Sequence, residues 1–290
     1  MTGILRNPYN TSQAREVLQK LRLSAQQPER LLASAIATFL DRSASPEEQV
    51  WIDRIESLRR ELAKSSGKIS VIDYGLPRDS PLGTSVERGV AQICQAAATP
   101  RLWGPLMFGL IRQFKPTNCL ELGTSLGISA SYQGAALELN RSGTLVTLEG
   151  APAVAEMATG NFRRLGINRI ETVPGRFQDT LDGVLSQLGS VDFAFIDGHH
   201  DQNATQAYFN QILPYLTTSA VVVFDDVSWS PGMRTAWETI TENSNITTAL
   251  DLSKVGICLL DRSRPNSYKS RLSWHPSLWQ RAAARIMYAS

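Results

Sequence analysis

Apolar residues recur at helical spacing through most of the first hundred residues. This spacing predicts helices over about 11–23, 28–41, 85–98 and 101–114, and another from Ser45 to Leu62. The segment Ser45-Pro46-Glu47-Glu48 is typical of a helix start, because serine caps free N–H groups and acids favour the positive end of the helix dipole. Glycine and proline residues recur through 67–84, which predicts a long loop.

From residue 117 onward, short β-rich runs alternate with helical stretches. Strands are expected at 118–122, 144–148, 169–173, 191–196 and 219–224, and helices at 128–139, 152–164, 177–188, 202–215 and 231–243. Such alternation predicts a parallel sheet with helices on both faces. The last two apolar runs, 246–252 and 255–261, lie too close together for a helical crossover. We therefore expect them to pair in antiparallel fashion.

The change of texture divides the chain into a helical N-terminal part (1–100), an α/β domain (101–265) and a tail (266–290). The 290 residues are 42% apolar and 19% charged, which excludes a disordered chain. The three cysteines form no C-x-x-C pair, so neither a disulfide scaffold nor structural zinc is expected. No apolar run approaches the roughly 20 residues of a membrane span, and the N-terminus lacks a signal-peptide layout. We therefore expect a soluble cytoplasmic protein with no membrane partner.

The net charge of +2 conceals an uneven distribution. Residues 101–265 contain 12 basic and 16 acidic side chains, a net of −4, whereas the tail has four basic residues and no acid. Four positive charges in a nearly neutral chain are a weak nucleic-acid footprint, so a nucleic-acid partner is not expected. The acids of the middle segment include several that follow predicted strands, and these are the candidates for a site.

Two features after successive strands favour a nucleotide-like ligand. Strand 118–122 runs into the turn Gly123-Thr-Ser125-Leu-Gly127, whose glycines permit close approach and whose following helix offers free N–H groups. The spacing is neither the dinucleotide G-x-G-x-x-G nor a P-loop, and a tight turn of any α/β protein would explain it equally. Glu149, at the end of the next strand, can accept both hydroxyls of a ribose or cap the following helix.

Carboxylates follow two further strands. Asp197 comes directly after 191–196, and Asp225 and Asp226 follow 219–224. At the carboxyl edge of a parallel sheet these side chains would lie together and resist ionisation unless a cation neutralises them. Oxygen ligands suit Mg²⁺, with Mn²⁺ or Ca²⁺ as alternatives. One or two of the carboxylates could instead cap the following helices.

Taken in order, the motifs ELGTSLGIS, TLEG, PGRFQDTL, VDFAFIDGHH and AVVVFDDVSW are specific. Through them, residues 117–262 resemble a class I S-adenosylmethionine-dependent methyltransferase of the O-methyltransferase branch, which includes catechol-type and sugar enzymes. The resemblance implies a Rossmann-like, seven-stranded, mostly parallel sheet with an antiparallel last strand and helices on both faces. Residues 101–265 would then be the S-adenosylmethionine-binding domain, with 1–100 as a helical subdomain for a lid or a dimer contact.

The resemblance also assigns site residues. It implies that the cofactor is bound by Glu121, Gly123, Thr124, Ser125, Ser129, Glu149, Gly175, Phe177 and Asp197. Glu149 would bind the ribose, and Gly175 and Phe177 would close over the adenine. The implied metal ligands are Asp197, Asp225 and Asp226. Catechol-type enzymes have Asn at the last of these positions, and Asp there resembles the sugar O-methyltransferases instead.

A general base near neutral pH would complete such a site, and histidine suits that role. His199 and His200 lie two and three residues after Asp197. Catechol-type enzymes place a lysine at the third position, and some sugar-type enzymes place an acid at the second, so this chain departs from both patterns. Both histidines are candidates for the catalytic base, with a slight preference for His199.

These features predict an S-adenosylmethionine-dependent O-methyltransferase, assisted by a divalent metal, that methylates a hydroxyl of a small molecule such as a secondary metabolite, sugar or phenol. The alternatives are a metal-independent enzyme, a methyltransferase whose basic tail grips RNA or a peptide, and a non-catalytic cofactor-binding scaffold. A nicotinamide dehydrogenase is least expected. The N-terminal helices could form a lid, a homodimer surface or a passive cover. Candidate walls of the acceptor pocket, although such aromatics more often pack in a core, are Tyr208, Trp229 and Trp237.

Overall fold

The computed structural model describes residue 9 and residues 11–72, 85–263 and 269–275. The first helices are α1 (Ser12–Arg22), α2 (Gln27–Asp41), α3 (Pro46–Ala63), α4 (Val90–Ala97) and α5 (Gly104–Phe114). Their positions confirm the helical reading of this region. Ser45 forms the expected cap: its hydroxyl accepts from the Glu48 N–H, and the Glu48 carboxylate accepts from the Ser45 N–H.

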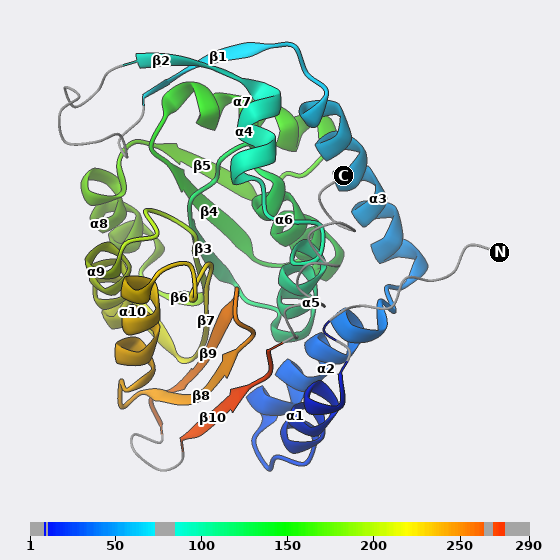
Figure 1. The fold of residues 1–290 in the computed structure, drawn as a ribbon, viewed down its shortest axis with the longest axis vertical. Coiled ribbons are helices and arrows are strands. Elements are labelled where there is room, and N and C mark those ends of the chain that lie inside the picture. Colours follow the sequence, from blue (N-terminus) through cyan, green and yellow to red (C-terminus); the bar gives the residue numbers. More distant parts are fainter. Residues whose placement is uncertain (1–8, 10, 73–84, 264–268, 276–290) are drawn as a thin grey trace.

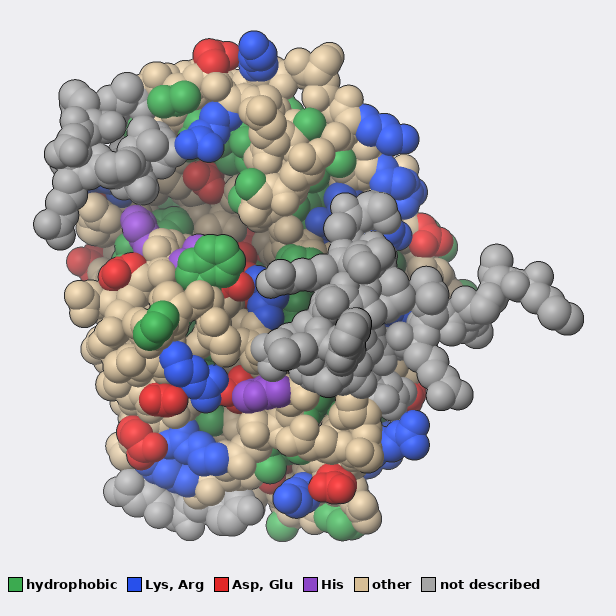
Figure 2. Space-filling view, in the orientation of Figure 1, with side chains coloured by type: hydrophobic (Ala, Val, Ile, Leu, Met, Phe, Trp, Pro, Cys, Tyr) green, Lys and Arg blue, Asp and Glu red, His purple; other side chains and the backbone are tan. Residues whose placement is uncertain are grey.

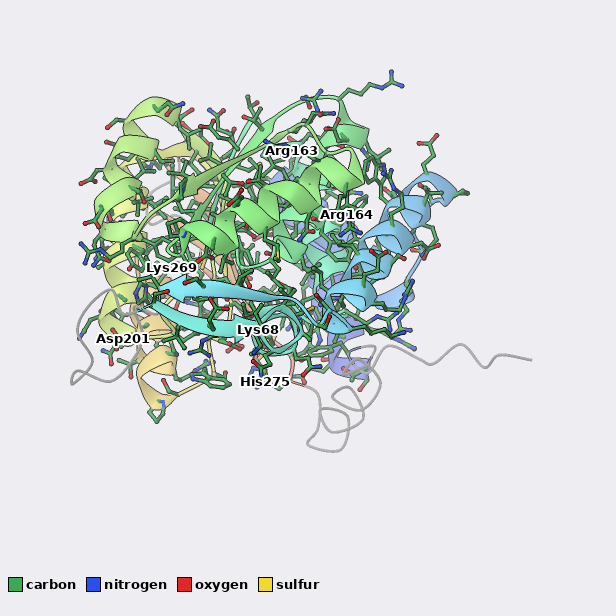
Figure 3. The ribbon with its side chains drawn as sticks, turned by 90° about the horizontal axis from the view of Figure 1, so that it is seen from above. Lys68, Arg163, Arg164, Asp201, Lys269 and His275 are labelled. Carbon is green, nitrogen blue, oxygen red and sulfur yellow. The ribbon has the colours of Figure 1, made fainter. Side chains whose placement is uncertain are left out.

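One part of the N-terminal prediction was wrong. Where a loop over 67–84 and a helix from 85 were expected, strands β1 (Lys68–Ile72) and β2 (Ser85–Gly89) pair in antiparallel fashion. The apolar members of β1 are half-buried in alternation, as a strand with one covered face requires. Figure 3 shows this hairpin running alongside α7 (Pro152–Leu165), the helix that carries Arg163 and Arg164.

Within the described residues, eight strands form the central sheet in the order β10-β8-β9-β7-β6-β3-β4-β5. The strands are β3 (Asn118–Leu122), β4 (Thr144–Glu149), β5 (Ile170–Pro174), β6 (Val191–Ile196), β7 (Leu216–Phe224), β8 (Ile246–Asp251), β9 (Gly256–Asp261) and β10 (Ser270–Ser273). The remaining helices are α6 (Ile128–Asn140), α8 (Phe177–Leu188), α9 (Gln202–Ile212), followed by a 3₁₀ turn at Leu213–Tyr215, and α10 (Pro231–Thr241). β9 runs antiparallel to both β7 and β8, and β3 to β7 are parallel, as predicted.

The sheet has one strand more than the seven expected. β10 lies in the tail, where no strand was predicted, and pairs in parallel with β8. Trp274 follows it directly and is fully buried, so the burial of this large side chain fixes the described part of the tail against the sheet. The residues from Pro276 onward lie outside the described residues.

Helices cover both faces of the sheet, as the alternation predicted (Figure 1). One apolar core lies between the sheet and α8, α9 and α10. The other lies between the opposite face and α5, α6 and α7, and it extends into the N-terminal helices. The strands are therefore packed between two helical layers, and these fix where the loops at the carboxyl ends of β3, β4, β6 and β7 begin.

The N-terminal helices extend the layer on one face of the sheet. α2 packs on α5 where Gly109 brings the helices close, since a Cβ built there would meet the Ala35 carbonyl oxygen at 3.6 Å. α3 contacts α6 through Glu56, which accepts from the Tyr132 hydroxyl at 2.7 Å and pairs with Arg101 at 2.7 Å. These contacts hold α2 and α3 against α5 and α6. The roles of the N-terminal helices as a lid or as a homodimer surface stay predictions. Across the described ranges, no helix is long and apolar enough to span a bilayer.

Candidate functional site

The loop after β3 has a backbone that requires glycine at two positions. Gly123 has φ +108°, and a Cβ there would lie 2.1 Å from the carbonyl oxygen of Asp197 on the neighbouring strand. Gly127 has φ +83°, and a Cβ there would lie 2.6 Å from the Phe162 ring. A side chain at either position would therefore clash, and the absence of Cβ atoms is what brings this loop against the end of β6.

Glu149, at the end of β4, holds that loop. One of its carboxylate oxygens accepts from the Ser125 N–H at 2.8 Å, and the other accepts from the Ala151 N–H at 2.9 Å. The second bond goes to the N-cap residue of α7 and not to an N–H of its first turn, so Glu149 does not cap the helix in the way weighed from the sequence. Each carboxylate oxygen keeps a further lone pair, so the two bonds leave acceptor capacity for ribose hydroxyls. The Ser125 hydroxyl is buried and has no hydrogen-bond partner among the described residues.

The Glu121 side chain lies beneath the loop after β3. Its side chain is fully buried, and its carboxylate accepts from Gln133 at 2.8 Å and from the Thr147 hydroxyl at 2.5 Å. Burial raises the pKa of Glu121 to about 7, against the opposing effect of these hydrogen bonds. Thr124 joins the network through its hydroxyl, 2.6 Å from that of Thr147. Glu121 is therefore held beneath the loop by buried hydrogen bonds, and its predicted contact with the cofactor stays a prediction.

The loop after β5 and the start of α8 close the same edge. Gly175 has φ +134°, and its N–H donates to the Glu149 carbonyl oxygen at 2.8 Å. Phe177 is buried, and its ring lies edge-on to His199 and Tyr208, with centroids 5.6 Å apart in both pairs. A Cβ on Gly198 would lie 2.4 Å from the Phe177 ring. The ring is thus packed beneath the loop that carries the two histidines.

The two histidines point to different places. The His199 ring nitrogen Nδ1 lies 3.0 Å from the Tyr208 hydroxyl, and burial lowers the pKa of His199. His200 instead lies between carboxylates, with Nε2 3.7 Å from Asp197 and Nδ1 3.6 Å from Asp226. The structure therefore brings His200 to the acidic cluster, although the sequence analysis slightly favoured His199 as the base.

The three predicted carboxylates do lie together. Asp197 and Asp225 follow neighbouring parallel strands, β6 and β7, and Asp226 has a left-handed φ of +53°, which turns it back toward His200. Burial, and then repulsion from Asp225, raises the pKa of Asp197 well above its usual value. Figure 2 shows acidic and histidine side chains around a hollowed part of this face.

A lysine that the sequence did not single out joins the cluster. Lys254, in the turn between β8 and β9, places Nζ 2.8 Å from Asp225 and 2.5 Å from Asp226. Burial lowers the pKa of Lys254, but the attraction of the two carboxylates outweighs it and raises the pKa above its usual value. The antiparallel register of β9 on β7 pairs Gly256 with Phe224 and so places Lys254 beside the two residues that follow β7. The sequence carries no signal of this register.

This lysine decides how well the cluster fits a metal. A divalent ion needs carboxylate oxygens that converge on an open position, whereas Asp225 and Asp226 converge on an ammonium. Within the part of the chain that the structure describes, no group of three or more His, Cys, Asp or Glu side chains is arranged to hold a metal ion. The arrangement of Asp197, Asp225 and Asp226 therefore does not fit the predicted metal.

Comparison with known proteins agrees with this geometry. Residues 120–227 match the family model described as a methyltransferase domain. These residues are therefore similar to a methyltransferase domain. A catechol O-methyltransferase of Mycobacterium tuberculosis is 33% identical over 138 residues, which cover 46% of this chain and 60% of that relative. The chain thus spans less than two thirds of the length of this curated relative.

Solved structures extend the comparison. An O-methyltransferase of Bacillus cereus in complex with SAH is 27% identical, with a TM-score of 0.51, and the match covers 58% of this chain and 84% of that one. The O-methyltransferase TomG of Streptomyces achromogenes, in complex with SAM, has a TM-score of 0.50 at 20% identity over 81% of this chain and 99% of that one. At that identity TomG shows the fold alone. Together with the family match, these similarities confirm the resemblance to class I O-methyltransferases.

The three aromatic residues that were candidates for a pocket wall lie in different surroundings. Trp229 is 71% exposed beside the cluster, with its ring centroid 6.4 Å from that of His200. Trp237 is buried in a core and packs on Phe224. Tyr208 is buried against His199. Only Trp229, of these three, is placed to contact a molecule that enters the hollow.

The described part of the basic tail is already paired. Lys269 donates to the Glu242 carbonyl oxygen at 2.8 Å, and Arg271 pairs with the Glu242 carboxylate at 3.0 Å. Arg281 and Arg285 lie outside the described residues. The pairing of Lys269 and Arg271 ties the tail to the end of α10.

Proposed function

We propose that the protein transfers a methyl group from S-adenosylmethionine to a hydroxyl group of a small molecule. The observation that carries this proposal is the placement of four groups on consecutive strands. The order β4-β3-β6-β7 sets Glu149, the Gly123 turn, Asp197 and Asp225 side by side at one edge of the sheet. Ligands of open α/β sheets bind at the carboxyl ends of the strands.

The residues at this edge fit the cofactor. The Gly123 turn leaves its backbone open to close approach, the Ser125 hydroxyl is a buried group in need of a partner, and Glu149 keeps acceptor capacity for ribose hydroxyls. When bound, S-adenosylmethionine supplies an electrophilic methyl group on a sulfonium sulfur. The protein's task is then to hold the acceptor oxygen in line with that methyl group.

His200 is the group of this site best placed to take the proton of the acceptor hydroxyl. The carboxylates of Asp197 and Asp226 flank its two ring nitrogens and would stabilise the imidazolium that forms. The exposed Trp229 ring offers an apolar surface beside it for a small acceptor. The proposed reaction does not include the divalent metal, Mg²⁺ foremost, that the resemblance implied. The reason is that Asp225 and Asp226 pair with Lys254.

Small acceptors are favoured over macromolecules. The two described basic residues of the tail, Lys269 and Arg271, are engaged with Glu242, which leaves the RNA or peptide alternative without a supporting contact. A non-catalytic scaffold would not need a histidine between two carboxylates.

Calorimetry with S-adenosylhomocysteine and a methyl-transfer assay with labelled S-adenosylmethionine test the proposal. We expect the wild type to bind the cofactor and to label hydroxylated acceptors such as catechols or sugars. Glu149→Ala should lower the affinity about 10–100-fold, since it removes an acceptor for two hydroxyls. Glu171→Ala, an exposed carboxylate on the adjacent strand, is the matched control and should leave the affinity unchanged. A wild-type protein that binds neither form of the cofactor would refute the proposal.

A further inference from the structure

The turn between β8 and β9 holds its lysine by the backbone. The Lys254 carbonyl oxygen accepts from the Val227 N–H at 3.0 Å, and the Lys254 N–H donates to the Leu252 carbonyl oxygen at 3.0 Å. Asp251 accepts from the Ser253 N–H at 2.7 Å, and Ser253 has a left-handed φ of +73°. Because Val227 follows Asp225 and Asp226 directly, the same hydrogen bond ties the lysine's backbone to the carboxylate loop.

The Lys254 side chain also binds the carboxylate loop. Nζ donates to Asp225 at 2.8 Å and to Asp226 at 2.5 Å, and the side chain is only 28% exposed. The second oxygen of Asp226 faces His200, as does an oxygen of Asp197. All three carboxylates are thus turned toward nitrogen atoms of the protein itself.

An ammonium and a divalent ion compete for such oxygens. Both would have to lie within bonding distance of Asp225 and Asp226, and two positive charges so close repel one another strongly in a partly buried site. Lys254 carries its charge at neutral pH without any special environment. It also reaches the carboxylates as part of the fold, so it binds them at no loss of a free ion's translational entropy.

We propose that the Lys254 ammonium is the resident cation of the Asp197, Asp225 and Asp226 cluster, and that this cluster binds no divalent metal. The inference deepens the proposed methyl transfer and rests on it for the role of the site. Of the three N–H donors of the ammonium, the described residues take two. The third is left to donate to the oxygen of a bound acceptor hydroxyl, which the lysine would position beside His200.

Binding of Mn²⁺, followed by electron paramagnetic resonance, tests the cation assignment without any acceptor. We expect the wild type to leave the signal of free Mn²⁺ unchanged at millimolar concentration. Lys254→Met should raise the affinity for Mn²⁺ at least about tenfold, because it removes a positive charge from the carboxylates. Asp225→Asn in the Lys254→Met background should abolish that gain. Lys20→Met, at an exposed position on α1, is the control and should behave as the wild type.

Two results would overturn the assignment. One is a wild type that binds Mn²⁺ and loses it on Asp225→Asn. The other is a folded Lys254→Met protein that binds no more Mn²⁺ than the wild type. If Lys254→Met does not fold, Lys254→Gln replaces it, and the wild-type titration decides in either case.

The same samples separate this inference from the proposed function. Calorimetry with S-adenosylhomocysteine reports the cofactor site independently of Mn²⁺, so failure of cofactor binding refutes methyl transfer and leaves the Mn²⁺ result standing. Where turnover is observed, EDTA should leave its rate unchanged. Loss of turnover in EDTA, restored by added Mg²⁺, would overturn the inference while methyl transfer stands.

Discussion

Replacing Gly123 by alanine should damage both the stability and the cofactor site. The new Cβ would lie 2.1 Å from the Asp197 carbonyl oxygen, which belongs to backbone and cannot rotate away. The left-handed φ of +108° adds a second penalty, because side chains rarely adopt it. The loop or the end of β6 must therefore move, and either movement displaces Asp197.

The two penalties can be estimated separately. A non-glycine residue held in a sparsely populated backbone region costs about 1–3 kcal/mol. Forcing an extra carbon into a closely packed position costs about 1–3 kcal/mol more. For a chain of this size the two penalties together should lower the thermal midpoint by roughly 3–10 °C.

Differential scanning calorimetry and cofactor titration measure the two effects on one sample. The matched control is Gly160→Ala in α7, where an added Cβ meets nothing within 4 Å. Because alanine is the better helix residue, this control should be stabilised by about 0.5–1 kcal/mol. A Gly123→Ala protein as stable as the wild type, with unchanged affinity for S-adenosylhomocysteine, would contradict the reasoning.

Three further predictions concern single side chains. Burial raises the pKa of Glu121 from 4.5 to about 7, so between these pH values the folded state keeps a proton that the unfolded chain releases. The free energy of unfolding should therefore fall by about 3 kcal/mol as the pH rises across this window. Glu121→Gln should remove this pH dependence, as measured by denaturant titrations at several pH values. Glu56→Gln should cost about 3 kcal/mol, because it removes the negative charge of a buried carboxylate that pairs with Arg59. Glu61→Gln, at an exposed ion pair, should cost less than about 1 kcal/mol. Equal losses of stability in the two variants would contradict this difference. Trp229→Ala should leave the thermal midpoint unchanged, since the side chain is 71% exposed, and should raise KM for an aromatic acceptor more than it lowers kcat.

The sequence was most informative where apolar periodicity is strong. The predicted strands at 118–122 and 191–196 and the helix at 177–188 have the bounds that the structure shows. Buried parallel strands and amphipathic helices carry their period in the residues themselves. β1 and β10 were missed because each has only four or five residues with one covered side, which leaves too short a pattern to distinguish from a loop.

The residue types of the candidate site could be predicted from the sequence, but the orientation of its side chains could not. Parallel topology alone brings Asp197 and Asp225 together, so the sequence sufficed for that step. His199 and His200 have φ values of +64° and +38° in an irregular loop, where no periodicity says which ring faces the carboxylates. Lys254 was missed because its place depends on the register between β7 and β9, which the sequence does not specify.

The contact between α1 and β10 has a consequence for how the chain folds. The Gln13 side chain donates to the Ser273 carbonyl oxygen, a pair separated by 260 positions, and Trp274 shares its core with the N-terminal helices. During synthesis those helices leave the ribosome first, whereas Trp274, one of their apolar partners, arrives among the last of the described residues. Contacts of such long sequence separation slow folding and prolong the exposure of apolar surface. We therefore expect the nascent chain to depend on chaperone protection until β10 has emerged.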